Sequence, residues 1–157
     1  MKKYNVFIDG SCKGVKDKEI AVGGWAYIIT DEQFNIVKED YGKLREGDQN
    51  STRAELEALY QVLLKMKGFK GNAKFTIYCD CESVVENLNG LAERKSNRDM
   101  WDRIEPLCRK LAGNFRVYHI NSHKKNTGDN KIIEFNHKVD KKAGVGANSL
   151  VLAPVKN

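Results

Sequence analysis

The sequence contains only two prolines and no long apolar run. Of its 157 residues, 41% are hydrophobic and 31% are charged, a balance typical of a folded globular chain rather than a disordered one. No stretch approaches the ~18 apolar residues that a membrane span needs. The short apolar stretch after the N-terminal lysines is too brief for a signal peptide. We therefore expect one domain over residues 1–157, with a core at about 4–145 and a tail at 146–157, acting as a cytoplasmic monomer without membrane contact.

Cysteine is scarce, and its spacing lacks the CxxC pattern of many metal and redox sites. The four cysteines are Cys12, Cys79, Cys81 and Cys108. A zinc site needs four converging ligands, and the close pair at 79 and 81 supplies only two. Without an export signal, we expect all four to be reduced and to fill small spaces in the fold.

Positive charge exceeds negative charge, with a net charge of +6 and a pI near 9.1. A solvated, lysine-rich surface is the commonest cause of such an excess. Its distribution is more informative, because residues 116–142 hold seven Lys or Arg residues against three Asp or Glu residues. A concentrated basic stretch favours an anionic partner, and nucleic acid above all.

Apolar runs and turn residues predict an α/β fold with a five-stranded mixed sheet and helices on both faces. The first three strands follow one another closely and are expected to be antiparallel. The predicted strands cover residues 4–8, 23–29, 34–42, 74–80 and 115–120, and the predicted helices cover 50–68, 82–89, 96–113 and 133–144. Pro106 is expected to kink the third helix or to begin a new one.

Two aspartates follow apolar strands directly. Asp9 ends "FID" and Asp80 ends "IYCD". Ligands gather beyond the carboxyl ends of strands in sheets of this kind, so the two carboxylates would lie close together if their strands were neighbours. A simpler explanation for either residue alone is that it begins a turn.

Two further acidic residues lie on predicted helices. Glu55 shares a helix flank with Ala58 and Leu59, where a solvated glutamate is not expected. Asp140 lies on the same side of the last helix as Asn136. Each has a simpler explanation, since a glutamate in the first turn favours the helix dipole and Asp140 could pair with a neighbouring lysine.

If the four carboxylates do converge, they cannot all stay ionised without cations. Hard divalent ions with oxygen ligands resolve this conflict, and Mg²⁺ suits carboxylates together with substrate phosphates. Two such ions, about 3.5–4 Å apart, would serve an in-line phosphoryl displacement.

These motifs together resemble type 1 ribonuclease H, the metal-dependent endonuclease that cuts the RNA strand of RNA–DNA hybrids. The similar segments are "FIDGSC" with "GGWAYII", then "STRAELEAL", "IYCDCESVV", and the closing "SH" with "NHKVDKKA", in the family's order. The resemblance runs from Tyr4 to about Ala143. It implies a ribonuclease H-like fold and a two-metal hydrolysis of hybrid RNA that leaves 3′-hydroxyl and 5′-phosphate ends.

The resemblance also implies residue roles. Asp9 would bridge two Mg²⁺ ions (Mn²⁺ is an alternative), Glu55 and Asp80 would each hold one, and Asp140 would complete the weaker site. His123 would assist turnover and product release, unless it is an ordinary surface histidine. The residues expected to contact the hybrid are Gly10, Ser11, Cys12, Asn50, Ser51, Thr52 and Asn136.

The chain departs from the family pattern in several places. The segment "KGVKDKEIAV" replaces a common Asn-Pro-Gly turn, Glu82 brings a negative charge near Asp80, and His137 stands where a glutamate is usual. A short "NGLAERKSN" replaces the long basic extension of many members, so we expect weaker hybrid binding unless the lysines of the last helix region compensate. These lysines are Lys124, Lys125, Lys131, Lys138, Lys141 and Lys142.

Two alternative functions fit the same fold. A nucleic-acid-binding module that has lost catalysis usually lacks one or more acidic ligands, and none is missing here. Strand-transfer and resolution enzymes space their acidic residues differently and usually carry further domains. The sequence therefore favours the hydrolase.

Overall fold

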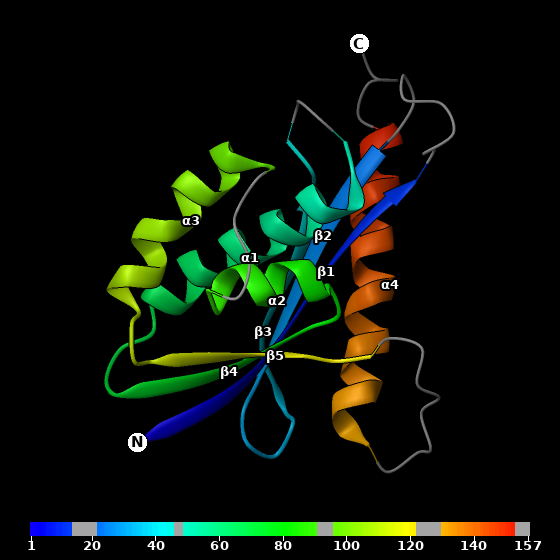
Figure 1. The fold of residues 1–157 in the computed structure, drawn as a ribbon. Helices are drawn as coiled ribbons and strands as arrows, with labels where there is room; N and C mark the ends of the chain where they lie inside the picture. Colours follow the sequence, from blue (N-terminus) through cyan, green and yellow to red (C-terminus); the bar gives the residue numbers. More distant parts are fainter. Residues whose placement is uncertain (14–21, 46–48, 91–95, 122–129, 153–157) are drawn as a thin grey trace.

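The computed structural model describes residues 1–13, 22–45, 49–90, 96–121 and 130–152, and shows a five-stranded sheet between two helical layers (Figure 1). The strands are β1 (Lys2–Lys13), β2 (Val22–Thr30), β3 (Ile36–Lys43), β4 (Ala73–Cys79) and β5 (Phe115–His119). The helices are α1 (Ser51–Lys67), α2 (Glu82–Leu88), α3 (Arg98–Lys110) and α4 (Lys131–Leu152). The predicted order of strands and helices is confirmed.

The sheet is mixed, with strand order β3-β2-β1-β4-β5. β1 pairs with β2, and β2 with β3, in antiparallel fashion, whereas β4 runs parallel to both β1 and β5. The first and fourth strands are therefore neighbours, which was the condition for their two aspartates to lie close together. This adjacency is what brings two distant aspartates to one edge of the sheet.

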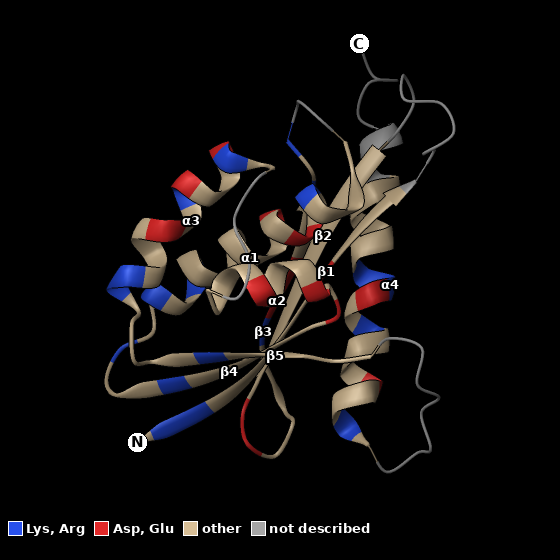
Figure 2. Ribbon diagram, viewed as in Figure 1, with Lys and Arg blue, Asp and Glu red and all other residues tan. Residues whose placement is uncertain are grey.

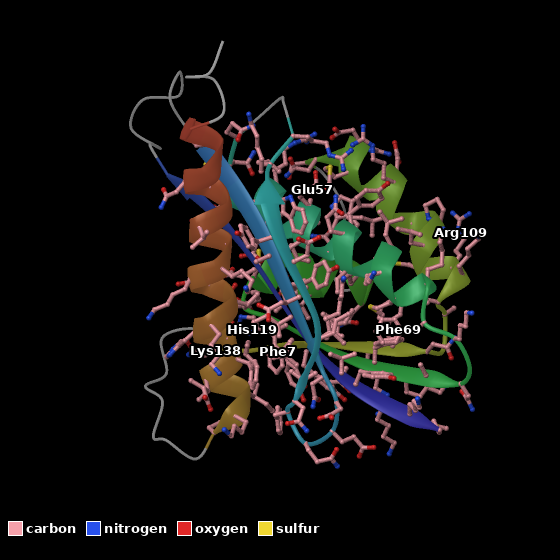
Figure 3. The ribbon with its side chains drawn as sticks, turned by 180° about the vertical axis from the view of Figure 1, so that it is seen from behind. Phe7, Glu57, Phe69, Arg109, His119 and Lys138 are labelled. Atoms are coloured by element: carbon pink, nitrogen blue, oxygen red, sulfur yellow. The ribbon has the colours of Figure 1, made fainter. Side chains whose placement is uncertain are left out.

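Residues of β1 alternate between two buried faces. Val6 and Ile8 pack in the core under α1, α2 and α3, whereas Phe7 packs under α4. All three are fully buried, which explains why the strand reads as a continuous apolar run rather than an alternating one. The two layers can be followed in Figure 3, where Phe7 lies on the side of α4 and Phe69 on the side of α1 and α3.

The first turn of α1 is fixed by its cap. The Asn50 side chain accepts a hydrogen bond from the Arg53 backbone N–H at 2.8 Å, as expected of an N-cap asparagine. The helix ends at Gly68, as predicted. Just before it, the Gln49 side chain accepts a bond from the Gly23 N–H at 2.9 Å, which ties the approach to α1 to strand β2.

Helix α4 is longer than predicted. It begins at Lys131 and runs to Leu152, so residues 146–152 of the expected tail continue the helix, and residues 153–157 lie outside the described residues. Glycines in this segment lower helix propensity by about 1 kcal/mol each, which made a stop plausible. Packing of α4 on the sheet overrides that preference. The helix lies so close to the strands that a Cβ added at Gly24 would collide with Ala147, and one added at Gly146 would collide with Gly42. The close approach of α4 to β2 and β3 depends on these glycines.

Helix α3 continues through Pro106, so of the two expected effects of the proline, a kink or a new helix, the new helix does not occur. The proline removes one backbone hydrogen bond, but the buried face of Met100, Trp101, Ile104 and Leu107 holds the helix against α1. Among the described residues, no helix is both long enough and apolar enough to span a membrane.

Candidate active site

The centre of the site lies where β4 ends beside β1. Strand β1 itself continues past Asp9 to Lys13, paired with β2, so the expectation that Asp9 follows the end of the first strand was wrong. The parallel pairing of β1 with β4 ends at Ile8 and Cys79, and Asp9 and Asp80 are the residues that directly follow this pair. Asp9, Glu55 and Asp80 each place one carboxylate oxygen within 4.8 Å of the others. The predicted convergence of these three side chains is therefore present in the structure.

Glu55 reaches this point because α1 rests directly on β1. A side chain at Gly10 would lie 2.3 Å from the backbone of Ala54 and Glu55, a distance that no real contact allows. The missing side chain at position 10 thus permits the helix to approach the strand. Glu55 is 6% exposed although it lies in the second turn of a helix, which accounts for its unusual apolar flank.

A buried thiol also contacts Glu55. The Cys79 Sγ lies 4.0 Å from Glu55 Oε2, a sulfur-to-oxygen distance suitable for a weak hydrogen bond in which the thiol donates. Cys79 is fully buried and all four cysteines are free thiols. The cysteine therefore supports one carboxylate of the site from the core side.

The electrostatics of the cluster favour a bound cation. Burial, followed by the neighbouring Glu55 carboxyl, raises the pKa of Asp9 far above its ordinary range. Burial likewise raises the pKa of Glu55 well above its usual value and raises the pKa of Asp80. Like charges in a water-poor site oppose one another's ionisation, and a divalent cation removes that conflict.

One oxygen in the cluster has no protein donor. Asp9 Oδ1 accepts the Gly10 backbone N–H at 2.9 Å, but Oδ2 is buried without a hydrogen-bond partner. An unpaired buried carboxylate oxygen is costly, at about 1–3 kcal/mol or more. An oxygen-only set of ligands with one unsatisfied oxygen fits a hard divalent cation such as Mg²⁺ or Mn²⁺.

Asp140 approaches the cluster from α4. It is exposed, its side chain contributes to raising the pKa of Asp9, and its charge contributes to raising the pKa of Asp80. One turn earlier, the Asn136 side chain is 3% exposed, and its Oδ1 has no hydrogen-bond partner. The two residues lie one turn apart on α4, but Asn136 is buried whereas Asp140 is exposed beside the cluster.

The other predicted contact residues lie on the two elements that carry Asp9 and Glu55. Gly10, Ser11 and Cys12 are the β1 residues that follow Asp9, and Asn50, Ser51 and Thr52 form the beginning of α1. Their contact with a hybrid remains a prediction. His123 lies outside the described residues.

Sequence reasoning missed an ion pair that holds the start of α1. Arg53 is buried and donates to Asp99 Oδ1 at 3.0 Å and also to Asp99 Oδ2. It also donates to Asn97 Oδ1 at 3.4 Å, and Asn97 has the left-handed conformation, with φ of 55°, just before α3. The pair links the first turn of α3 to the helix that carries Glu55. No sequence spacing signals it, because the partners are far apart along the chain.

Replacing Asp99 with alanine is expected to lower the free energy of unfolding by about 1 kcal/mol, because it removes two bonds to a buried guanidinium while Asp99 itself is solvent-screened. Arg53 lowers the pKa of Asp99 to about 2. The contribution of the pair is therefore present above about pH 4 and is lost as the pH falls through about 2. Urea denaturation of both proteins between pH 2 and 6 measures this. If Asp99→Ala lowered the free energy of unfolding by the same amount at every pH, this explanation of the ion pair would be wrong.

Comparison with known proteins identifies the family. The fold and site define an α/β domain with a mixed five-stranded sheet and an acidic cluster where the pairing of β1 with β4 ends. The family model for RNase H matches residues 1–148, and the chain belongs to the RNase H family. No curated protein sequence matches the chain significantly.

Solved structures of this family share the fold at low sequence identity. The LC11 RNase H1 isolated from compost is 20% identical, with a TM-score of 0.76 over 96% of this chain and 99% of that one. The same enzyme in complex with an RNA/DNA hybrid gives a TM-score of 0.73, at 20% identity over 94% and 99% of the two chains. RNase H1 from Halobacterium salinarum NRC-1 is 16% identical, with a TM-score of 0.72 over 94% and 98%.

Proposed function

We propose that this protein is an endonuclease that hydrolyses the RNA strand of RNA–DNA hybrids and leaves 3′-hydroxyl and 5′-phosphate ends. The observation that carries the proposal is the convergence of Asp9, Glu55 and Asp80, with one buried Asp9 oxygen lacking a donor, in a chain of the RNase H family. A structural neighbour, LC11 RNase H1, binds an RNA/DNA hybrid. A module without catalysis would have no reason to retain so costly a cluster of acids.

In this proposal, two Mg²⁺ ions are held by the four acidic residues. Asp9 would contact both ions, Glu55 and Asp80 one each, and Asp140 would complete the more exposed site. Such ions, when bound, activate a water nucleophile and neutralise the charge that develops on the scissile phosphate. Mn²⁺ satisfies the same oxygen ligands and would serve as a substitute.

The protein's own groups prepare the site for that chemistry. Burial around Asp9 and Glu55 excludes bulk water and strengthens every charge interaction there. The thiol of Cys79 and the contact between Gly10 and α1 orient Glu55 before any substrate binds. Preorganised groups of this kind need no rearrangement during the reaction.

The hybrid would lie along the edge formed by residues 10–12 and the beginning of α1. The first backbone N–H groups of a helix have no intrahelical acceptor and are suited to phosphate oxygens. Hydroxyl groups of Ser51 and Thr52 could meet a ribose 2′-hydroxyl, the group that distinguishes RNA from DNA. His123 would assist product release from the adjoining loop.

The lysines of α4 offer limited compensation for the short connection between α2 and α3. Lys131 and Lys138 both lie near Glu134, at 3.2 and 3.4 Å, and Lys142 pairs with Glu39. Exposed pairs of this kind are weak and can be exchanged for phosphate contacts. We therefore propose that the chain binds hybrids more weakly, and with a shallower salt dependence, than relatives that carry a basic extension.

The test is incubation with an end-labelled RNA–DNA hybrid, with duplex RNA and duplex DNA of the same sequence as controls. We expect internal cleavage of the RNA strand in the hybrid alone, dependent on Mg²⁺ or Mn²⁺ and stopped by chelation. Ligation and phosphatase treatment of the products identify their ends. Cleavage of all three duplexes, or absence of metal-dependent cleavage of the hybrid, would overturn the proposal.

A further inference from the structure

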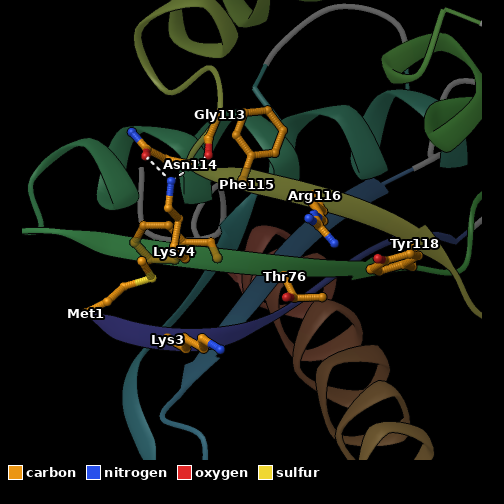
Figure 4. A pocket seen from close by; sticks show the side chains of 10 residues that line it. Met1, Lys3, Lys74, Thr76, Gly113, Asn114, Phe115, Arg116 and Tyr118 are labelled. Carbon is orange, nitrogen blue, oxygen red and sulfur yellow. Dashed lines mark hydrogen bonds between the residues drawn. The ribbon is translucent and has the colours of Figure 1, made fainter.

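One face of the sheet is only half covered. Helix α4 packs on β1, β2 and β3 but makes few contacts with β4. Among the described residues, no helix covers the part of this face formed by β4 and β5. A hollow of about 410 Å³ lies at this place, lined by residues of β1, β4 and β5 and of the turn before β5 (Figure 4).

Side chains on the open face form three rows across the strands. Parallel register aligns Lys3 with Lys74 in the first row and Thr76 with Arg116 in the second. The third row aligns Phe7, Tyr78 and Tyr118. Basic residues on the three neighbouring strands are visible side by side in Figure 2. At ~3.3 Å per residue, the distance from the first row to the third is about 13 Å.

The aromatic row offers an exposed ring. Phe7 stacks on Tyr78 with ring centroids 5.3 Å apart, and Tyr78 lies 6.2 Å from Tyr118. Phe7 is buried and Tyr78 is half-buried, whereas Tyr118 is 46% exposed. The two inner rings hold the outer one in place on a rigid strand. An exposed aromatic ring on a sheet is a stacking platform for an unpaired base.

The cations of this face are available for a ligand. Among the described residues, Lys3 and Arg116 take part in none of the ion pairs found, and no acidic side chain belongs to the three rows. Lys74 has a structural role instead, since its Nζ donates to Gly113 O at 2.8 Å and Asn114 Oδ1 at 3.0 Å. Positive charge beside an exposed ring complements a phosphate backbone whose bases can turn outward.

The rows continue directly toward the acidic cluster. Tyr78 precedes Asp80 by two residues, and Phe7 precedes Asp9 by two, so the aromatic row lies about 7 Å along the strands from the carboxylates. A nucleic-acid strand that leaves the acidic cluster can therefore cross the aromatic row and then the basic rows while staying in contact with the sheet.

We propose that this open face of β4 and β5 is a binding site for a single-stranded nucleic acid, with a base stacked on Tyr118 and phosphates beside Lys3 and Arg116. This surface is separate from the hybrid-binding edge at α1 and goes beyond the proposed function. The site contains no base-reading pattern, so it binds unpaired strands with little sequence preference.

The test measures binding, without cleavage, of a fluorescent single-stranded deoxythymidine oligonucleotide to the metal-free full-length protein across a salt series. Two variants probe the face, Tyr118→Ala and the double variant Lys3→Glu with Arg116→Glu. Tyr41→Ala is the matched control for the ring, because Tyr41 is 44% exposed on the opposite edge strand. Lys38→Glu is the charge control, an exposed lysine on the same edge strand.

We expect Tyr118→Ala to weaken binding roughly tenfold. The double variant should weaken it more and should lower the salt slope by about 1.4, the value for two lost phosphate contacts on a single strand. Both controls should bind as the wild type does. Thermal unfolding verifies that every variant is folded.

Three outcomes would overturn the proposal: equal binding by wild type and Tyr118→Ala, an unchanged salt slope in the double variant, or equally strong competition by polyglutamate. This binding assay does not depend on cleavage. A protein that cleaves no hybrid would therefore refute the proposed hydrolysis without affecting the test of this binding site. Loss of binding in the face variants with normal cleavage of blunt hybrids would support the face as a separate site.

Discussion

Replacing Asp9 with asparagine is expected to lower the rate of metal-dependent hybrid cleavage by at least roughly 10²–10³-fold, because the exchange removes the carboxylate that the proposal places on both ions. The fold should survive, since the amide keeps the size of the side chain and can still accept the Gly10 N–H bond. Single-turnover cleavage of a labelled hybrid measures the loss.

The same substitution should make the metal-free protein more stable. Burial raises the pKa of Asp9, so the folded state holds this proton more tightly than the unfolded chain does. The stabilising contribution is complete below about pH 4 and decreases as the pH rises. At neutral pH, removing the buried carboxylate should therefore raise the free energy of unfolding by about 1–3 kcal/mol. Urea denaturation in the presence of a chelator, between pH 4 and 9, measures this difference.

Metal ions should reverse the order of stability. Added Mg²⁺ is expected to bind the folded wild-type site and to stabilise it, increasingly so at higher pH where protons compete less. It should have a much smaller effect on Asp9→Asn. Asp102→Asn, at an exposed aspartate of α3, is the control and should retain both cleavage and metal response. If, in the absence of metal, Asp9→Asn were less stable than the wild type, the assignment of Asp9 as a buried carboxylate that destabilises the metal-free fold would be wrong.

Replacing Gly10 with alanine should impair both stability and cleavage. The new Cβ would lie 2.3 Å from the backbone of Ala54 and Glu55, where no flexible side chain can move away, so α1 must shift as a whole. Such overpacking costs about 1–3 kcal/mol. A shift of about 1 Å in Glu55 should reduce the rate of cleavage roughly 10²-fold.

Gly68→Ala is the matched control for this substitution. Its added Cβ would meet only the Lys65 carbonyl at 3.4 Å, an ordinary contact, and φ at this residue is −83°. Gly10→Ala should therefore have a clearly lower free energy of unfolding and a clearly lower rate of hybrid cleavage than Gly68→Ala. Full activity in folded Gly10→Ala would show that Glu55 does not depend on this close approach.

The cases of Asp9 and Glu55 show why acidic residues could be selected from sequence. A carboxylate directly after an apolar run, and another on the apolar flank of a helix, contradict the usual rule that charges remain in water. The family motifs then gave their order along the chain. The same reasoning could not separate Asn136 from Asp140, which share a helix side but differ in burial, because burial depends on what packs above each residue.

Contacts between distant segments could not be predicted in the same way. The pairing of Arg53 with Asp99 and the support of Glu55 by Cys79 join residues from different elements, and no periodicity records such neighbours. The length of α4 was misjudged for a related reason. Its glycines look like a helix end locally, whereas in the fold Gly146 allows close packing on β3 at Gly42.

Local sequence determined the order of strands and helices through short-range periodicity, and the cost of burying charge, together with the family motifs, selected the candidate acidic residues. The tertiary structure decided which carboxylates meet, which side chains support them and which face of the sheet stays open. These features depend on strand adjacency and on the fit of glycines against distant backbone, and both arise only when the chain has folded.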